Sequence, residues 1–261
     1  MPSDLIPFKM DLHIHTVVSP CAEVEMIPPF IVERAIELGL DMIAITDHNT
    51  AENVRAVQQA AQGTVLKVIA GMEVQTREEV HMLCLFDTAE QICAWQARVY
   101  NSLPAVPNRP EVFGAQFVVD STGEYICDNE RLLLTSTDMS VEDVVAGVQE
   151  LQGLAIAAHV DRPSYSLLAN LGFVPEDLAL GGLEISRRQS AASFRKAYAN
   201  LNHWPLIASS DAHQLSDMTV RTQATMASRT VAELARALRG EGGRQVCVIE
   251  GADERIAQWG G

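Results

Sequence analysis

The chain has 261 residues, of which 48% are hydrophobic and 20% charged, a composition typical of a globular protein. Lys and Arg number 19 against 34 Asp and Glu, so the formal charge of −15 argues against broad, non-specific binding to nucleic-acid backbone. No apolar run of about 18 residues and no leader pattern occurs, and the five cysteines are scattered, which predicts a cytoplasmic protein without a membrane span.

Short apolar runs alternate with helix-like stretches along the chain. The runs predict buried strands over residues 8–13, 41–46, 65–70, 80–86, 154–158, 182–186, 206–209 and 246–249. The other stretches predict helices over residues 28–38, 51–61, 89–101, 141–151, 191–200 and 231–239. This alternation implies a mostly parallel sheet, and at this length we expect one α/β domain over residues 1–261, built as a closed or nearly closed β/α barrel.

Residues 103–139 interrupt the alternation. Their first part is rich in proline and turn formers, and their second part is typical of a hairpin around residues 121–123. We expect an insertion between barrel elements and not a second domain. Three roles stay open for it: a cover over the active site, a subunit contact in a homo-oligomer, or a plain surface excursion.

Six of the seven histidines fall at or near the carboxyl end of a predicted strand. The segments are MDLHIH, MIAITDH, VIAGMEVQTREEVH, LAIAAH and LIASSDAH. Side chains two apart on a strand point to the same face, so each His-x-His or Asp-x-His pair can direct two ligands at one point. These strand ends meet at the barrel mouth, and imidazole with carboxylate suits Zn²⁺, Mn²⁺ or Fe²⁺. The sequence therefore predicts a multinuclear metal site, with His203 excluded because it precedes a strand.

The order of these motifs resembles that of the PHP family, the polymerase and histidinol phosphatase domains. The chain has HIH at 13–15, TDH at 46–48, GME at 71–73 with His81, AH at 158–159 and DAH at 211–213. The resemblance covers nearly the whole chain except residues 103–139. It implies a distorted (β/α)7 barrel with a trinuclear metal centre, filled by two to three divalent ions of Zn, Mn or Fe.

The resemblance also implies a ligand set for each metal. The first would be held by His13, His15, Glu73 and Asp211, the second by Glu73, His81 and His159, and the third in part by His48 and His213. The family supplies a further ligand five or six residues after the second histidine, where this chain has Pro20 and Cys21. Cys21 as a thiolate, Glu23 and Glu25 are the alternatives, and we favour Glu25.

Three further acids are predicted to support the ligands. Glu184 ends another strand at the mouth, and Asp11 shares the strand parity of His13. Asp47 is either a ligand or a partner that orients His48.

A site of this kind suits phosphoester hydrolysis, because a hydroxide that bridges two metals is a nucleophile at neutral pH. The resemblance likewise implies a metal-dependent phosphoesterase. We expect a small phosphorylated substrate, a phosphate monoester or a nucleotide, and no extended nucleic-acid surface. The predicted catalytic residues are Asp211 and His159, and the predicted phosphate contacts are Arg162, Arg187, Arg188 and Ser164. Tyr165 either stacks a base or packs in the core.

Two other functions stay open at this point. The same hydroxide could attack the carbonyl of an amide or a lactone, as in other metal-bearing barrels. The chain could instead be a non-catalytic PHP module, although such modules lose several ligands and nearly the full set is present here.

Overall fold

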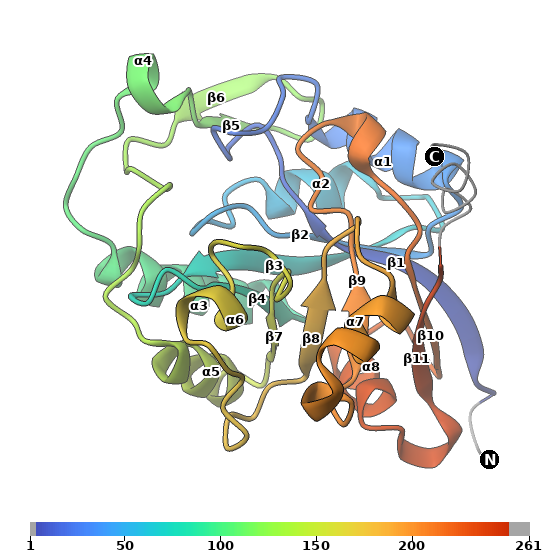
Figure 1. The fold of residues 1–261 in the computed structure, drawn as a ribbon. Helices are drawn as coiled ribbons and strands as arrows, with labels where there is room; N and C mark the ends of the chain where they lie inside the picture. Colours follow the sequence, from blue (N-terminus) through green and yellow to red (C-terminus); the bar gives the residue numbers. More distant parts are fainter. Residues whose placement is uncertain (1–3, 251–261) are drawn as a thin grey trace, which may run out of the picture.

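A computed structural model describes residues 4–250 of the chain (Figure 1). The strands are β1 Ile6–Ile14, β2 Met42–Ile45, β3 Lys67–Gln75, β4 His81–Phe86, β5 Phe117–Val119, β6 Tyr125–Asp128, β7 Leu154–Ala157, β8 Gly182–Ile185, β9 Leu206–Ala208, β10 Thr222–Met226 and β11 Gln245–Val248. The helices are α1 Pro28–Glu37, α2 Val54–Ala60, α3 Ala89–Ser102, α4 Pro110–Phe113, α5 Val141–Glu150, α6 Leu167–Asn170, α7 Ala191–Ala197 and α8 Val231–Leu238, with 3-10 turns η1 Ala199–Leu201, η2 Leu215–Asp217 and η3 Glu241–Gly243.

Within these residues, nine strands form one sheet in the order β11-β10-β1-β2-β3-β4-β7-β8-β9. Strands β1, β2 and β3 are parallel to one another, as are β7, β8 and β9. The end strands β9 and β11 lie against each other, so the sheet is a nearly closed barrel. The predicted α/β barrel class is confirmed.

The barrel has two antiparallel strands that the sequence did not predict as such. Strand β4 follows β3 through the tight turn at residues 76–80, where the Thr76 amide donates to the Val80 carbonyl at 2.9 Å. So short a connection allows only an antiparallel pair, because a parallel strand needs a long crossover. Strand β10 pairs antiparallel with β1 and β11. It was missed because Thr and Gln alternate with its inward residues and hide the apolar pattern.

All eight predicted strands and all six predicted helices are present, with ends that shift by a few residues. Helix α3 begins with a reciprocal capping box between Thr88 and Gln91, and α5 with one between Ser140 and Asp143. Helix α2 begins at Val54, three residues later than predicted.

Alternate residues of the strands face two apolar layers. Ile43 and Ile45 of β2 pack in a large cluster that also contains buried residues of α1, α2, α3 and α5. Met42 and Ala44 face a smaller cluster that α8 covers through Leu234 and other residues. The strands are therefore fixed on both faces, and their carboxyl ends are held at one edge of the barrel.

Residues 103–139 contain α4 and an antiparallel hairpin of β5 and β6, so the predicted hairpin is confirmed. The hairpin lies beside the barrel in Figure 1. The Phe117 amide donates to the Val17 carbonyl at 3.1 Å, and the Asn49 amide group donates to the Leu133 carbonyl at 2.8 Å. The segment thus lies along the loops that follow β1 and β2. That the chain forms one domain stays a prediction.

Nowhere in residues 4–250 is there a helix with the length and apolar character that crossing a membrane requires.

Candidate metal centre

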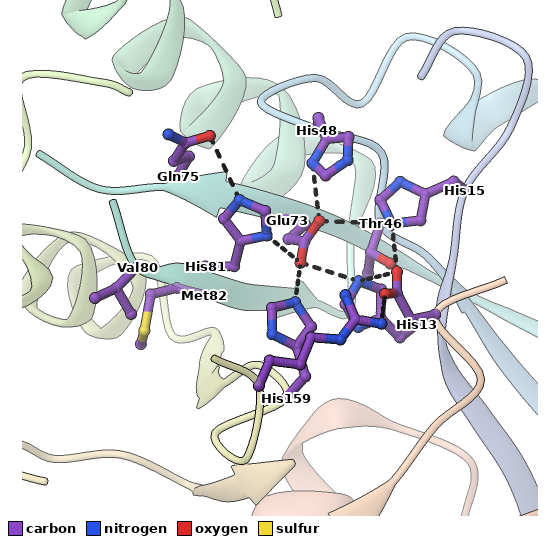
Figure 2. A network of polar contacts seen from close by, with 12 residues as sticks. His13, His15, Thr46, His48, Glu73, Gln75, Val80, His81, Met82 and His159 are labelled. Atoms are coloured by element: carbon purple, nitrogen blue, oxygen red, sulfur yellow. Dashed lines mark hydrogen bonds and ion pairs between the residues drawn. The ribbon is translucent and has the colours of Figure 1, made fainter. Parts of the chain in front are cut away.

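Glu73 of β3 is the point on which the predicted ligands converge (Figure 2). Its Oε1 lies 3.1 Å from Nε2 of His13, 2.9 Å from Nδ1 of His81 and 3.1 Å from Nε2 of His159. Its Oε2 lies 2.9 Å from Nδ1 of His48 and 3.5 Å from Nε2 of His15. Five imidazoles from the ends of four strands thus surround one buried carboxylate.

Asp211, after β9, supplies a second carboxylate. Its Oδ1 lies 3.3 Å from Nε2 of His13 and 3.1 Å from Nε2 of His15. His213 completes the group, since its ring stacks on that of His15 with centroids 4.3 Å apart. Six histidines therefore gather at one place, whereas His203 is exposed and next to Trp204.

Both carboxylates are ionised. Burial raises the pKa of Glu73, but the surrounding imidazoles, His81 first, hold it well below its usual range. Burial likewise raises the pKa of Asp211, and His13 and His15 bring it well below its ordinary value. Ionised carboxylates inside a protein need positive partners, which the imidazoles or bound cations can supply.

The geometry around His13 fits a metal ion. Burial opposes a charged His13, yet Glu184, Asp211 and Glu73 together raise its pKa well above the usual value, so this point favours positive charge. Nδ1 of His13 donates to Glu184 Oε2 at 2.9 Å, while Nε2 has no hydrogen-bond partner although it faces Glu73. Ligand atoms around an ion with bonds of 2.0–2.2 Å lie about 3 Å apart, as these atoms do.

Three sets of side chains have donor atoms close enough together to hold an ion. They are His13, His15 and Glu73; His48, Glu73 and His81; and His15, His48 and His213.

The three predicted supporting acids are buried at the centre, but they act in different ways. Glu184 fixes His13 and also accepts from the His159 amide at 3.0 Å. Asp11 accepts from the amides of Ser210 and Thr219, at 3.0 and 3.2 Å, and so holds the loop that carries Asp211.

Asp47 acts through Ser19, which the sequence analysis did not single out. The Ser19 hydroxyl donates to Asp47 Oδ1 at 2.7 Å, so it must accept from Nδ1 of His15 at 3.0 Å. Nε2 of His15 then turns its lone pair to the centre. The same hydroxyl accepts from the backbone amide of His48 at 3.2 Å, so the predicted orientation of the His48 ring by Asp47 is not what the structure has. No sequence signal marks Ser19, because the contact depends on how the loop after β1 folds back.

Cys21 and Glu25 are both exposed, and neither belongs to one of the three ligand sets within the described chain. Burial raises the pKa of the Cys21 thiol, but hydrogen bonds with His213 and His48 lower it to about 6. The carboxylate of Glu25 accepts from the Leu215 amide at 3.3 Å. The preference for Glu25 is thus not supported.

Two residues predicted to be catalytic have a strained backbone. His159 has φ of 27° and Asp211 has φ of 51°, both in the left-handed region that non-glycine residues seldom adopt. Such strain gathers at functional sites, where the surrounding structure enforces it.

A pocket of about 500 Å³ opens beside the centre. Three of its lining residues are the predicted phosphate contacts Arg162, Arg187 and Arg188, and Asp211 and His213 line it as well. Arg162 forms an ion pair with Asp211. Ser164 is exposed and does not line this pocket, so its predicted phosphate contact is not supported.

Known proteins match this chain in sequence and in fold. Residues 11–95 match the family model described as PHP domain. The 5′-3′ exoribonuclease Rnm of Salmonella typhimurium is 34% identical over 80 residues, which cover 29% of this chain and 26% of that protein. The lesion-specific endonuclease PfuEndoQ of Pyrococcus furiosus has a TM-score of 0.70 at 19% identity, over 97% of this chain and 66% of that chain.

An endonuclease Q complex with a 27-mer duplex has a TM-score of 0.64 at 19% identity, over 92% of this chain and 58% of that one. This chain therefore spans less than two thirds of that endonuclease and 26% of the exoribonuclease.

These relatives overturn one prediction. We expected a small phosphorylated substrate and no extended nucleic-acid surface, whereas the relatives are named as an exoribonuclease and an endonuclease, one of them with bound duplex. The expectation was wrong because it rested on the net charge of −15, which describes the whole surface. Local arginines and bound cations set the potential where a phosphate binds.

Residues 11–95 therefore match the PHP domain family, and the barrel is similar in fold to that of endonuclease Q.

Proposed function

We propose that this chain is a metal-dependent hydrolase of phosphoester bonds and that its substrates are nucleic-acid phosphodiesters. The observation that most supports this is the position of Asp211. One of its oxygens faces His13 and His15, and the other pairs with Arg162 in the arginine pocket. A phosphate in the pocket would therefore lie beside the centre.

We propose two to three divalent ions, Zn²⁺, Mn²⁺ or Fe²⁺, as the cofactor. Bound ions would lower the pKa of water toward about 7 and offset charge on the phosphoryl oxygens. The residues we propose to hold them are His13, His15, Glu73, His81, His159, Asp211, His48, His213 and Cys21.

The chain's own residues would bind and orient the substrate. Arg162, Arg187 and Arg188 line the pocket, where Arg162 pairs with Asp211 and Arg187 with Asp217. Their guanidinium groups would bind phosphoryl oxygens, which match them in charge and geometry. Because the pKa of Asp211 lies well below its ordinary value, Asp211 would orient the attacking water and would not act as the acid. Glu184 and Ser19 would keep the imidazoles of His13 and His15 in place.

The names of the relatives support a nucleic-acid substrate, since one is a 5′-3′ exoribonuclease and another is a lesion-specific endonuclease. The arginine pocket favours a phosphoester over an amide or a lactone, since neither of these carries a phosphate charge. Inorganic phosphate should therefore inhibit the reaction.

The test is hydrolysis of a 5′-phosphorylated single-stranded RNA in Mn²⁺ by wild type, His159→Ala and His203→Ala. Loss of a centre histidine should lower kcat about 100-fold or more. His203→Ala is the matched control, because His203 is exposed and lies outside the cluster. Equal turnover by the His159 and His203 variants would refute the proposal.

A further inference from the structure

We propose that Tyr165 is the platform on which a nucleobase of the substrate stacks beside the metal centre. The inference rests on the proposed function and adds to it a second contact that recognises the base, where the arginines recognise phosphate.

The Tyr165 ring lies one side chain away from the centre. It stacks on the His81 ring with centroids 4.9 Å apart and an angle of 24° between the planes. His81 in turn contacts Glu73 at 2.9 Å. Tyr165 is nevertheless 45% exposed, so the ring is ordered against His81 and still open to a ligand.

The loop between β7 and α6 places Tyr165 at a fixed distance from the rest of the site. His159, Arg162 and Tyr165 follow one another at intervals of three residues. The Arg162 amide donates to the His159 carbonyl at 2.9 Å, and the Ser166 hydroxyl donates to the Arg162 carbonyl at 2.8 Å. One short, hydrogen-bonded loop thus carries a proposed metal ligand, a proposed phosphate contact and an exposed aromatic ring.

The backbone of Tyr165 is held in an unfavourable conformation. Its φ is 55°, in the left-handed region, and its carbonyl accepts from the His81 amide at 3.1 Å. Burial of the ring does not account for this strain, because large aromatic residues of the core such as Trp95 and Phe194 are almost fully buried, whereas Tyr165 is not. The ring of Tyr165 therefore does not pack in the core, which was the other prediction from the sequence.

Stacking on an aromatic ring suits an unpaired nucleotide. Every base has a π face, so this contact tolerates any sequence, and it does not depend on attraction between charges. The base would rest on Tyr165 while its phosphate lies toward Arg162.

The test is a double-mutant cycle in which the Tyr165 ring and one base of the RNA are removed separately and together. Wild type and Tyr165→Ala are compared on a 5′-phosphorylated single-stranded RNA and on matched RNAs in which one of the first three nucleotides is abasic. Tyr165→Trp serves as the conservative variant. Tyr125→Ala is the matched control, because Tyr125 is an exposed tyrosine of β6 in the insertion hairpin.

We expect Tyr165→Ala to raise KM for the intact RNA about 5- to 100-fold with little change in kcat. On the RNA that lacks the stacked base, wild type and Tyr165→Ala should have the same KM, and Tyr165→Trp should behave as wild type on both. The Tyr125 variant should match wild type throughout.

Two results would overturn the inference while the proposed function stands. One is an unchanged KM in Tyr165→Ala. The other is an equal loss on intact RNA and on every abasic RNA, which would mean that the ring supports His81 and not a base. No cleavage of any RNA by wild type would instead refute the proposed function and the inference with it.

Discussion

At the scale of single residues, hydrogen bonds to one ring nitrogen decide where the other points. Glu184 binds Nδ1 of His13, and Ser19 binds Nδ1 of His15, so both histidines turn Nε2 to Glu73 and Asp211. The sequence predicts Glu184 because it ends a strand at the mouth. It does not predict Ser19, which has no acid or imidazole to mark it.

We predict that Ser19→Ala weakens metal binding about 10-fold, because Nδ1 of His15 loses the partner that fixes the ring. Calorimetric titration with Mn²⁺ measures the effect. The matched control is Thr16→Val, which removes a 2.9 Å hydrogen bond to the same Asp47 carboxylate and leaves the link to His15 intact. If both variants lose the same affinity, Ser19 acts only by supporting Asp47.

At the scale of elements, the local hydrophobic pattern predicts well where a strand occurs but poorly whether it runs parallel or antiparallel to its neighbours. The eight predicted strands are present, but the antiparallel course of β4 follows from a turn, and β10 is stabilised by pairing with β1, whose residues are some 200 positions away. The periodicity of a strand predicts neither its direction nor the partner strand that stabilises it.

Glu233 in the first turn of helix α8 connects the helix to neighbouring segments of the chain. Glu233 accepts from the Ala227 amide at 2.8 Å and pairs with Arg244 at 2.7 Å, which ties the helix to the start of β11. Hydrogen bonds from Arg244 lower the pKa of Glu233 from 4.5 to about 2.

We predict that Glu233→Gln lowers the free energy of unfolding at pH 7 by about 1–2 kcal/mol, after allowance for solvent screening. The folded pKa lies below the unfolded value, so the ionised carboxylate stabilises the fold above pH 4.5. This difference should shrink as pH falls from 4.5 toward about 2. Urea unfolding between pH 7 and pH 3.5 measures it. Glu37→Gln, which breaks the exposed pair with Arg34, should change stability little at any pH. A gap between wild type and Glu233→Gln that stays constant with pH would contradict the assignment.

At the scale of the whole molecule, the centre joins parts of the chain that are far apart in sequence. Its residues come from β1, β3 and β4 and from the segments that follow β1, β2, β7 and β9. Bound ions would therefore link most of the barrel mouth and stabilise the folded state by mass action.

We predict that chelation with EDTA lowers Tm by about 5–10 °C and that added Mn²⁺ restores it. Glu73→Gln should lose this response, because Glu73 contacts five of the six clustered imidazoles. Glu37→Gln should respond as wild type does. Differential scanning fluorimetry measures the shift without any assay of activity. If neither EDTA nor Mn²⁺ changes the Tm of wild type, the clustered side chains bind no metal.

The sequence by itself determined the alternation of strands and helices and the placing of histidines and acids at strand ends, because periodicity and residue type are local properties. Only the tertiary structure decided which of these side chains meet. The contacts of Ser19 with His15 and with Asp47 and the pairing of Arg162 with Asp211 depend on strand order and on how the loops fold back. Contacts between residues as far apart as 13 and 211 arise only when the whole sheet is assembled, so no local pattern encodes them.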